Sequence, residues 1–250
     1  QKFTAVVNSE YRNSVTLNHS ATHLLQASLR QILGDHVTQK GSLVNSKYLR
    51  FDFSHYQKVE KEELEAIEKL VNYKIRSSIA LKEDRNIPFD KAIQQGAMAL
   101  FGEKYGDTVR MVTFDQDFSV ELCGGTHVSN TAQIGSFRIV SEGAVAAGVR
   151  RIEAFTGAHA DDYVKNQLEL LDLVRSELGN QKDILKAIKD IKNENFSFKE
   201  KLEAFEHEQV AGLKNKLKSS IQNINGMQVI IETIEVDKAA QVKDLCFQLK

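Results

Sequence analysis

The chain has 250 residues, of which 42% are hydrophobic and 27% are charged, and its formal net charge is −1. These values are ordinary for a globular protein of one large domain or two modest ones. They exclude a chain that binds nucleic acid through an overall basic charge, while leaving room for a local basic patch. The two cysteines make no disulfide framework, so we expect a reducing, cytoplasmic location. No apolar run approaches the roughly 18 to 20 residues that cross a bilayer, so we expect no membrane contact.

The first part of the chain is predicted to be a mixed α/β domain. Through residue 157 the chain carries 11 of its 14 glycines and its only proline. Apolar residues there alternate between the helical and the strand period. The predicted elements are a strand over 3–7, a helix over 14–33 capped by Gly34, two strands within 36–55 with a turn near 45–46, a helix over 60–80, a short helix over 89–95, and strands over 108–114, 117–122, 134–141 and 149–155.

Helical spacing dominates the second part of the chain. Two helices are predicted within 158–221, with a break at Gly179 and Asn180, which are residues that end helices. The apolar seam of the second helix has a polar residue, Asn195, at one of its heptad positions. This pattern predicts a long helical hairpin or coiled-coil-like segment. A turn at 225–226, a strand over 227–236 and a helix over 237–249 follow. The overall expectation is an α+β fold with a largely antiparallel sheet.

Two pairs of metal-ligand residues stand far apart in the sequence. His19 and His23 are four residues apart on a predicted helix, which places both side chains on one face. Cys123 and His127 have the same spacing and follow a predicted strand. Three imidazoles and one thiolate suit Zn²⁺, which prefers tetrahedral nitrogen and sulfur ligation. We therefore predict a two-sided zinc cleft that forms when the two segments fold together.

Each pair also has an ordinary explanation, because a single histidine pair on an amphipathic helix arises often by chance. It is the joint occurrence of two matched pairs that favours a metal. A zinc peptidase needs a glutamate beside the first ligand, and that place holds Ser20, so a peptidase is disfavoured. The sequence fits both a closed structural site with four protein ligands and a catalytic site with three ligands and a water.

Residues with little side chain flank the predicted ligands. Gly124 and Gly125 leave the backbone bare beside the metal. Gln39, Lys40 and Gly41 offer an amide, a cation and bare backbone, and they could form one wall of a substrate site. For Gln39 the alternative is an ordinary position on the surface of a hairpin.

Six stretches resemble alanyl-tRNA synthetases, and they occur in the order that this family has. Together they span about residues 14–157. The Arg-Phe-Asp-Phe and Cys-Gly-Gly-Thr-His motifs among them favour the alanyl branch over the related threonyl branch. The resemblance implies the editing domain of this family. The six stretches are 18–25, 39–44, 49–55, 101–107, 121–128 and 146–154.

This resemblance implies an activity and a set of site residues. The activity is hydrolysis of the ester that joins serine or glycine, wrongly, to the tRNA for alanine. The family motif assigns the zinc ligands to the two predicted pairs, and it matches Gln39 to a glutamine implicated in editing. The Gln39 amide could hold either the attacking water or the amino acid. Contacts to the substrate or the tRNA acceptor end are expected from Thr22, Lys40, Gly41, Arg50, Gly124, Gly125, Arg150 and Arg151. For the four basic residues among them the alternative is a solvated surface position or a structural ion pair.

The resemblance also divides the chain into three parts. A zinc-dependent editing domain is expected over 1–157, a helical linker over 158–221, and the truncated start of a C-terminal domain over 222–250. Because the sequence opens with Gln1, we expect a segment of a longer enzyme, one that lacks the ATP-binding domain for aminoacylation. In the full-length enzyme a homodimer through the C-terminal region is a further expected contact. Two alternatives remain, a non-catalytic zinc-stabilised tRNA-binding module and a free-standing or threonyl-type deacylase.

Overall fold

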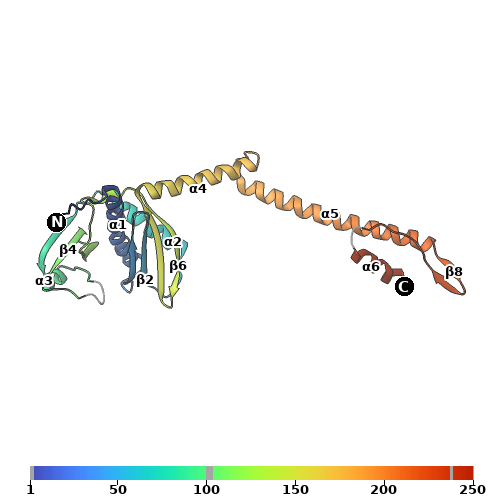
Figure 1. The fold of residues 1–250 in the computed structure, drawn as a ribbon, viewed down its shortest axis with the longest axis horizontal. Coiled ribbons are helices and arrows are strands. Elements are labelled where there is room, and N and C mark those ends of the chain that lie inside the picture. The colour runs from blue at the N-terminus through green and yellow to red at the C-terminus, as the bar shows by residue number, and fades with distance from the viewer. Residues whose placement is uncertain (1–2, 100–103, 237–238, 250) are drawn as a thin grey trace. The chain divides into compact units, whose positions relative to one another are not determined.

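The computed structural model describes residues 3–99, 104–236 and 239–249. The chain divides into two compact units, Gln1–Glu169 and Leu170–Lys250 (Figure 1). The predicted motif over 101–107 falls partly outside the described residues. None of the described helices combines the length and apolar character that a membrane span requires.

The first unit begins with a long helix, α1 (Ser9–Leu33). The Asn8 side chain caps its first turn by accepting the N–H of Tyr11 at 2.8 Å, and Gly34 ends it with a φ of +114°. The predicted helix is therefore confirmed, although it starts five residues before Ser14. The strand predicted over 3–7 is wrong. Those residues lead into the cap and are exposed, and none of the strands in the described part of the chain pairs with them.

A four-stranded antiparallel sheet carries the main core of the first unit. Its strands lie in the order β1 (Gln39–Val44), β2 (Leu49–Ser54), β7 (Val149–Thr156) and β6 (Phe137–Ala146). Both strands predicted within 36–55 are confirmed, with the Asn45 side chain accepting two backbone N–H groups in the turn between them. The helices α1 and α2 (Lys61–Arg76) pack together, and they bury Leu24, Leu25 and Ile67 in one cluster with Phe51, Phe53, Phe137 and Ile152 of the sheet.

A second, three-stranded antiparallel sheet holds the strand that leads to Cys123. Its order is β3 (Lys82–Pro88), β4 (Thr108–Asp115) and β5 (Ser119–Leu122), and the short helix α3 (Phe89–Gln94) packs on it over a second apolar cluster. The sequence analysis missed β3, because Ile87 is the only buried residue in this otherwise polar strand. The strand predicted from 134 starts at Phe137, and a 3₁₀ turn (Thr131–Ile134) precedes it.

The helices α4 (Gly157–Glu177) and α5 (Ile184–Ser219) confirm the two helices predicted for the linker. The chain turns between them at Gly179 and Asn180, whose φ values are +71° and +58°. The predicted packing of the apolar seam is not found among the described residues. Leu171, Ile191 and Phe198 are 43%, 53% and 65% exposed, so these positions of the seam are not buried.

The C-terminal residues form a short hairpin and a last helix. Strands β8 (Gln222–Ile224) and β9 (Met227–Val229) pair antiparallel through the predicted turn at 225–226. The strand predicted to reach residue 236 is shorter than expected and ends at Val229. Helix α6 (Ala239–Leu249) confirms the predicted last helix, of which residues 237–238 lie outside the described part.

Candidate metal centre

The fold brings the two predicted ligand pairs together. His19 and His23 lie one turn apart on α1, and Cys123 and His127 lie in the loop that follows β5. One donor atom from each residue falls within 4.8 Å of the other three. Sequence separations of about a hundred residues are thus closed by the packing of α1 against the smaller sheet. Their role as metal ligands stays a prediction, and their convergence is a finding.

The donor atoms face one another in a way that fits a metal ion. The Nε2 atoms of His19 and His127 lie 3.5 and 3.3 Å from the Cys123 sulfur. The His23 Nε2 is buried and has no hydrogen-bond partner. Buried polar atoms in proteins almost always have a partner, so an unpartnered imidazole nitrogen beside a thiol fits a role as a metal ligand. Three nitrogens and one sulfur are the donor set that Zn²⁺ prefers.

The electrostatics of the cluster favour a cation. Burial opposes ionisation of the Cys123 thiol, yet the hydrogen bonds with His127 and His19 and the nearby charge of His23 hold its pKa down to about 3. Burial also lowers the pKa of His127 to about 4, which keeps that imidazole neutral. For His23 burial acts the same way, but the carboxylate of Glu121 raises its pKa to about 10. A thiolate and a neutral imidazole are the forms in which these side chains bind metals, so Cys123 and His127 are already in that form and His23 would release a proton on binding.

Ser20 ties the ligand loop to α1. Its Oγ donates to the Thr16 carbonyl at 2.9 Å and accepts the backbone N–H of Val128 at 3.0 Å. The same Oγ lies 3.4 Å from Nδ1 of His127. Ser20, whose place beside His19 disfavours a peptidase, therefore helps to position His127, the fourth predicted ligand.

Gly125 of the loop has to be a glycine because its backbone lies close to the His19 ring. A Cβ on Gly125 would lie 2.1 Å from Cε1 of the His19 ring, which is far inside contact distance. At Gly124 a Cβ would meet no atom within 4 Å. The expectation of bare backbone beside the cluster is met at both positions, but only Gly125 is sterically essential. Their contact with a substrate stays a prediction.

Arg110 supports the loop from β4. Its Nη1 donates to the carbonyl oxygens of Cys123 and Gly125 at 2.9 and 2.5 Å. Its other terminal nitrogen contacts the Glu83 carboxylate, which also binds Arg85. Hydrogen bonds from Arg110 and Arg85 lower the pKa of Glu83 to about 2. A chain of three charged side chains therefore runs from the ligand loop to β3.

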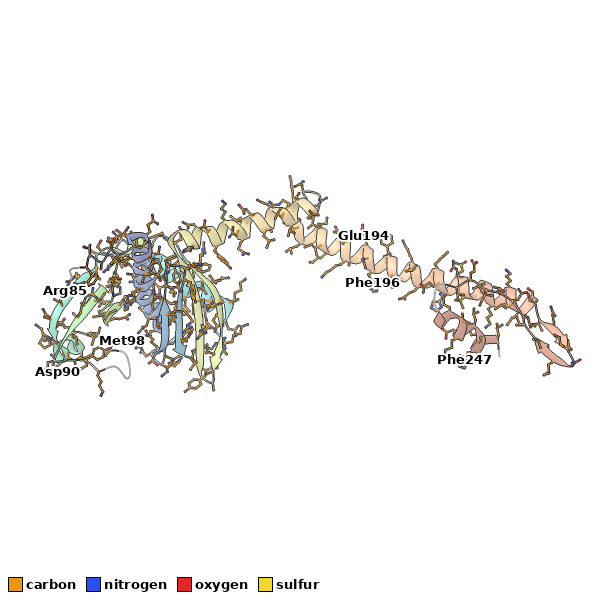
Figure 2. All side chains as sticks on the ribbon, in the orientation of Figure 1. Arg85, Asp90, Met98, Glu194, Phe196 and Phe247 are labelled. Atoms are coloured by element: carbon orange, nitrogen blue, oxygen red, sulfur yellow. The ribbon has the colours of Figure 1, made fainter. Side chains whose placement is uncertain are left out.

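A cavity of about 610 Å³ opens beside the cluster. Residues 124–127 of the loop form one wall, including the His127 side of the cluster. Arg110 and β3 form the other wall, with Arg85, labelled in Figure 2, projecting from that strand. A larger hollow of about 700 Å³ lies beside the turn between α4 and α5, but no cluster of metal-ligand residues was found there among the described residues. The cavity at the metal cluster is the better candidate, since it combines space with chemistry.

The arginines expected to contact tRNA are engaged in ion pairs. Arg150 binds Glu142 through two hydrogen bonds of 2.6 and 2.8 Å, and Arg151 binds Asp52 through two of 2.7 and 2.8 Å. Arg50 is held less tightly. Its Nε lies 3.7 Å from an oxygen of Asp52, and this buried nitrogen has no hydrogen-bond partner. The sheet therefore gives all three a structural role, and their contact with RNA stays a prediction.

The remaining predicted site residues lie on α1 and β1. Thr22 is buried and donates its hydroxyl to the Asn18 carbonyl at 2.9 Å, so it is engaged within the helix. Residues 39–41 open β1, where Gln39 is half-buried opposite Phe53. A Cβ on Gly41 would approach the Asp52 carboxylate to 3.2 Å. Their proposed contacts with substrate are untested.

Sequence reasoning missed the charged residues that surround the cluster. Glu121, Arg110 and Glu83 all lie on strands of the smaller sheet. Glu121 carried a usable signal, because a charged residue two positions before Cys123 on a buried strand needs a partner. Arg110 and Glu83 carried none, since their contacts depend on the pairing of β4 with the unpredicted β3.

The sequence matches one known family of protein domains. Residues 109–153, which include the loop with Cys123 and His127, match a family model described as the threonyl and alanyl tRNA synthetase second additional domain.

Over nearly its whole length the chain is also similar to alanine–tRNA ligases. The chain is 50% identical to the enzyme of Christiangramia forsetii over 248 residues, which are 99% of this chain and 28% of that protein. The enzymes of Flavobacterium psychrophilum and Cytophaga hutchinsonii are 49% and 47% identical over 97% and 98% of the chain. The chain spans about 28% of the curated relatives it matches. The resemblance to alanyl-tRNA synthetases drawn from the motifs is therefore confirmed.

Proposed function

We propose that the chain is the editing segment of an alanine–tRNA ligase, and that it hydrolyses the ester of tRNA for alanine that carries serine or glycine. The observation that supports this most is the convergence of four donor atoms within 4.8 Å beside a cavity of about 610 Å³. The relatives support tRNA as the partner, since they are alanine–tRNA ligases.

Physical limits on selection explain why such an enzyme needs a second site. A pocket built for alanine cannot strongly exclude glycine, which is smaller, and it rejects an added hydroxyl poorly. A separate hydrolytic site removes the wrong product after it forms. The cavity beside the cluster has polar walls, and its loop wall includes the open backbone of Gly124.

The chain's own residues supply the parts of the proposed site. His19, His23, Cys123 and His127 would hold Zn²⁺, which when bound acts as a Lewis acid toward an ester carbonyl or a water. Gln39 is proposed to orient the attacking water or the amino acid by its amide. Backbone N–H groups beside that amide would stabilise the developing oxyanion.

The test is deacylation by the zinc-loaded chain. Seryl-tRNA for alanine should release serine, correctly charged alanyl-tRNA should persist, and His23→Ala or chelation should abolish the release. Seryl-tRNA for threonine tests the threonyl-type alternative. Gln39→Ala should keep its zinc and slow hydrolysis by about 10- to 1,000-fold, the usual range for losing an oriented donor. Full activity in that variant would remove Gln39 from the site.

A second candidate is a non-catalytic tRNA-binding module stabilised by zinc. The observation that favours it is the number of protein donors, because four of them close a tetrahedral site. Under this alternative the zinc-loaded chain binds the tRNA and leaves the ester intact. Removal of the metal would then unfold the first unit and have no separate effect on chemistry.

A further inference from the structure

Glu121 is a buried carboxylate whose described partner of opposite charge is a histidine of the cluster. One of its oxygens contacts Nδ1 of His23, and the two side chains are only 7% and 9% exposed. Its other oxygen lies 3.5 Å from the Ser119 hydroxyl. Burying a carboxylate is costly unless it is paired, so this contact has to compensate for the loss of water around Glu121.

The contact determines which nitrogen of His23 is available to a metal. A carboxylate is an acceptor, so Nδ1 must carry the proton and donate it to Glu121. Nε2 is then the nitrogen left for a metal, once its own proton is displaced, and it is the buried atom that lacks a hydrogen-bond partner. A free neutral imidazole samples both tautomers, whereas the neutral form of His23 keeps its proton on Nδ1 and leaves Nε2 as the ligand.

We propose that Glu121 is a positioning residue for the metal centre: it fixes the tautomer and the ring orientation of His23 and balances the charge of the bound ion. The proposal rests on the metal centre of the proposed function. A divalent ion with one thiolate and three neutral imidazoles keeps one positive charge in a partly buried place. The carboxylate of Glu121 brings that sum to zero, without itself binding the metal.

The corresponding group behind His127 is weaker. There the hydroxyl of Ser20 lies 3.4 Å from Nδ1, is uncharged, and already bonds to Thr16 and Val128. Charge-assisted hydrogen bonds are roughly twice as strong as neutral ones. Of the two histidines, His23 is therefore the one whose ligand geometry depends more on the group behind it.

The test measures zinc affinity by competition with a chromophoric chelator, using the whole chain. Glu121→Ala should weaken zinc binding by about 10- to 100-fold, the range found when the partner of a ligating histidine is removed. Glu121→Gln keeps an acceptor oxygen but no charge, so its loss should be smaller. The control is Glu68→Gln, because Glu68 binds Arg138 and the N–H of Ile139 away from the cluster. That control should change zinc affinity by less than about twofold.

A spectroscopic measurement separates positioning from a general structural effect. In the zinc-loaded wild type, ¹⁵N NMR of His23 should show a protonated Nδ1 and a metal-bound Nε2. Glu121→Ala should lose the strongly hydrogen-bonded Nδ1 proton, and the Glu68→Gln control should retain it. If Glu121→Ala does not fold, the wild-type spectrum and Glu121→Gln decide the matter.

Two results would overturn the proposal. One is a folded Glu121→Ala variant with zinc affinity within about twofold of the wild type. The other is a wild-type spectrum with the metal on Nδ1 of His23. Failure of the wild type to bind zinc would overturn the metal centre together with this proposal. Failure to deacylate seryl-tRNA, with zinc bound as expected, would count only against the proposed editing reaction.

Discussion

The two halves of the metal centre are held in place by different kinds of structure. His19 and His23 lie inside a capped helix of 25 residues whose middle is buried, so their spacing follows from the helix itself. Cys123 and His127 lie in a loop with no regular hydrogen-bond ladder. Their places depend on Arg110 and on the Ser20 hydroxyl, which belong to distant segments. Local sequence thus determines the helical half, whereas tertiary contacts determine the loop half.

Removing one ligand from each half should have the largest effect. Structural zinc sites bind with about 10 to 16 kcal/mol, so each of four ligands accounts for roughly 3 kcal/mol. His19→Ala and Cys123→Ser should therefore each weaken zinc binding by at least about 100-fold, since 1.4 kcal/mol is a factor of ten. Chelator competition measures the affinity, and circular dichroism reports whether the apo chain folds. Equal zinc affinity in wild type and either variant would exclude that residue as a ligand.

The next largest effect on zinc affinity is expected from one of two matched substitutions in the loop, Gly125→Ala and Gly124→Ala. In Gly125→Ala the new methyl group would overlap the His19 ring, so either the loop or the histidine must move. We expect about 10- to 100-fold weaker zinc binding, comparable to the loss of a group that orients a ligand. In Gly124→Ala the methyl group enters open space, and zinc affinity should stay within about twofold.

If Gly124→Ala weakened zinc binding as much as Gly125→Ala, the effect would have to come from loop flexibility. The same two variants also test whether the loop backbone at the cavity contacts the substrate. Gly124→Ala should slow deacylation more than it weakens zinc binding if this stretch of backbone contacts the substrate. The readout is the ratio of the two losses in one preparation.

The difference between the halves also explains what the sequence could predict. The helix over 14–33 and the i, i+4 histidines follow from periodicity and local capping, so they were predictable. The convergence of the two pairs was predictable from the preferences of a metal ion. Glu83 and Arg110 were not, because β3 shows no alternation and its pairing with β4 is set by distant contacts. For Arg150 and Arg151 the sequence leaves both RNA contact and structural ion pairs open, because it does not reveal the carboxylates that bind them.

Arg110 offers a more moderate perturbation of the loop half. Arg110→Gln removes two hydrogen bonds to loop carbonyls and the ion pair with Glu83. Hydrogen bonds to charged groups contribute about 1.5 to 3 kcal/mol, so the free energy of unfolding should fall by about that amount. Arg85→Gln removes an arginine whose side chain is 76% exposed, and it should cost less than about 1 kcal/mol. Urea unfolding of the first unit measures the loss of unfolding free energy in each variant. Equal losses would show that Arg110 does not specifically support the loop.

The smallest expected effect is a pH dependence from Glu83. Hydrogen bonds from Arg110 and Arg85 lower its pKa from 4.5 to about 2 in the folded chain. A carboxyl group whose pKa is lowered by folding stabilises the folded state above the unfolded pKa. That contribution should be complete above pH 4.5 and should fade as the pH drops toward 2. Its size is small because the ion pairs of Glu83 border the open cavity, where solvent screens them.

The measurement compares the free energy of unfolding of the wild type and Glu83→Gln between pH 2 and pH 6. The two should differ most at the upper end and converge at the lower end, since protonated Glu83 and glutamine are both uncharged. A constant offset across this range would mean that Glu83 acts through its shape or its hydrogen bonds. In that case the charge of Glu83 would have no part in fixing the ligands.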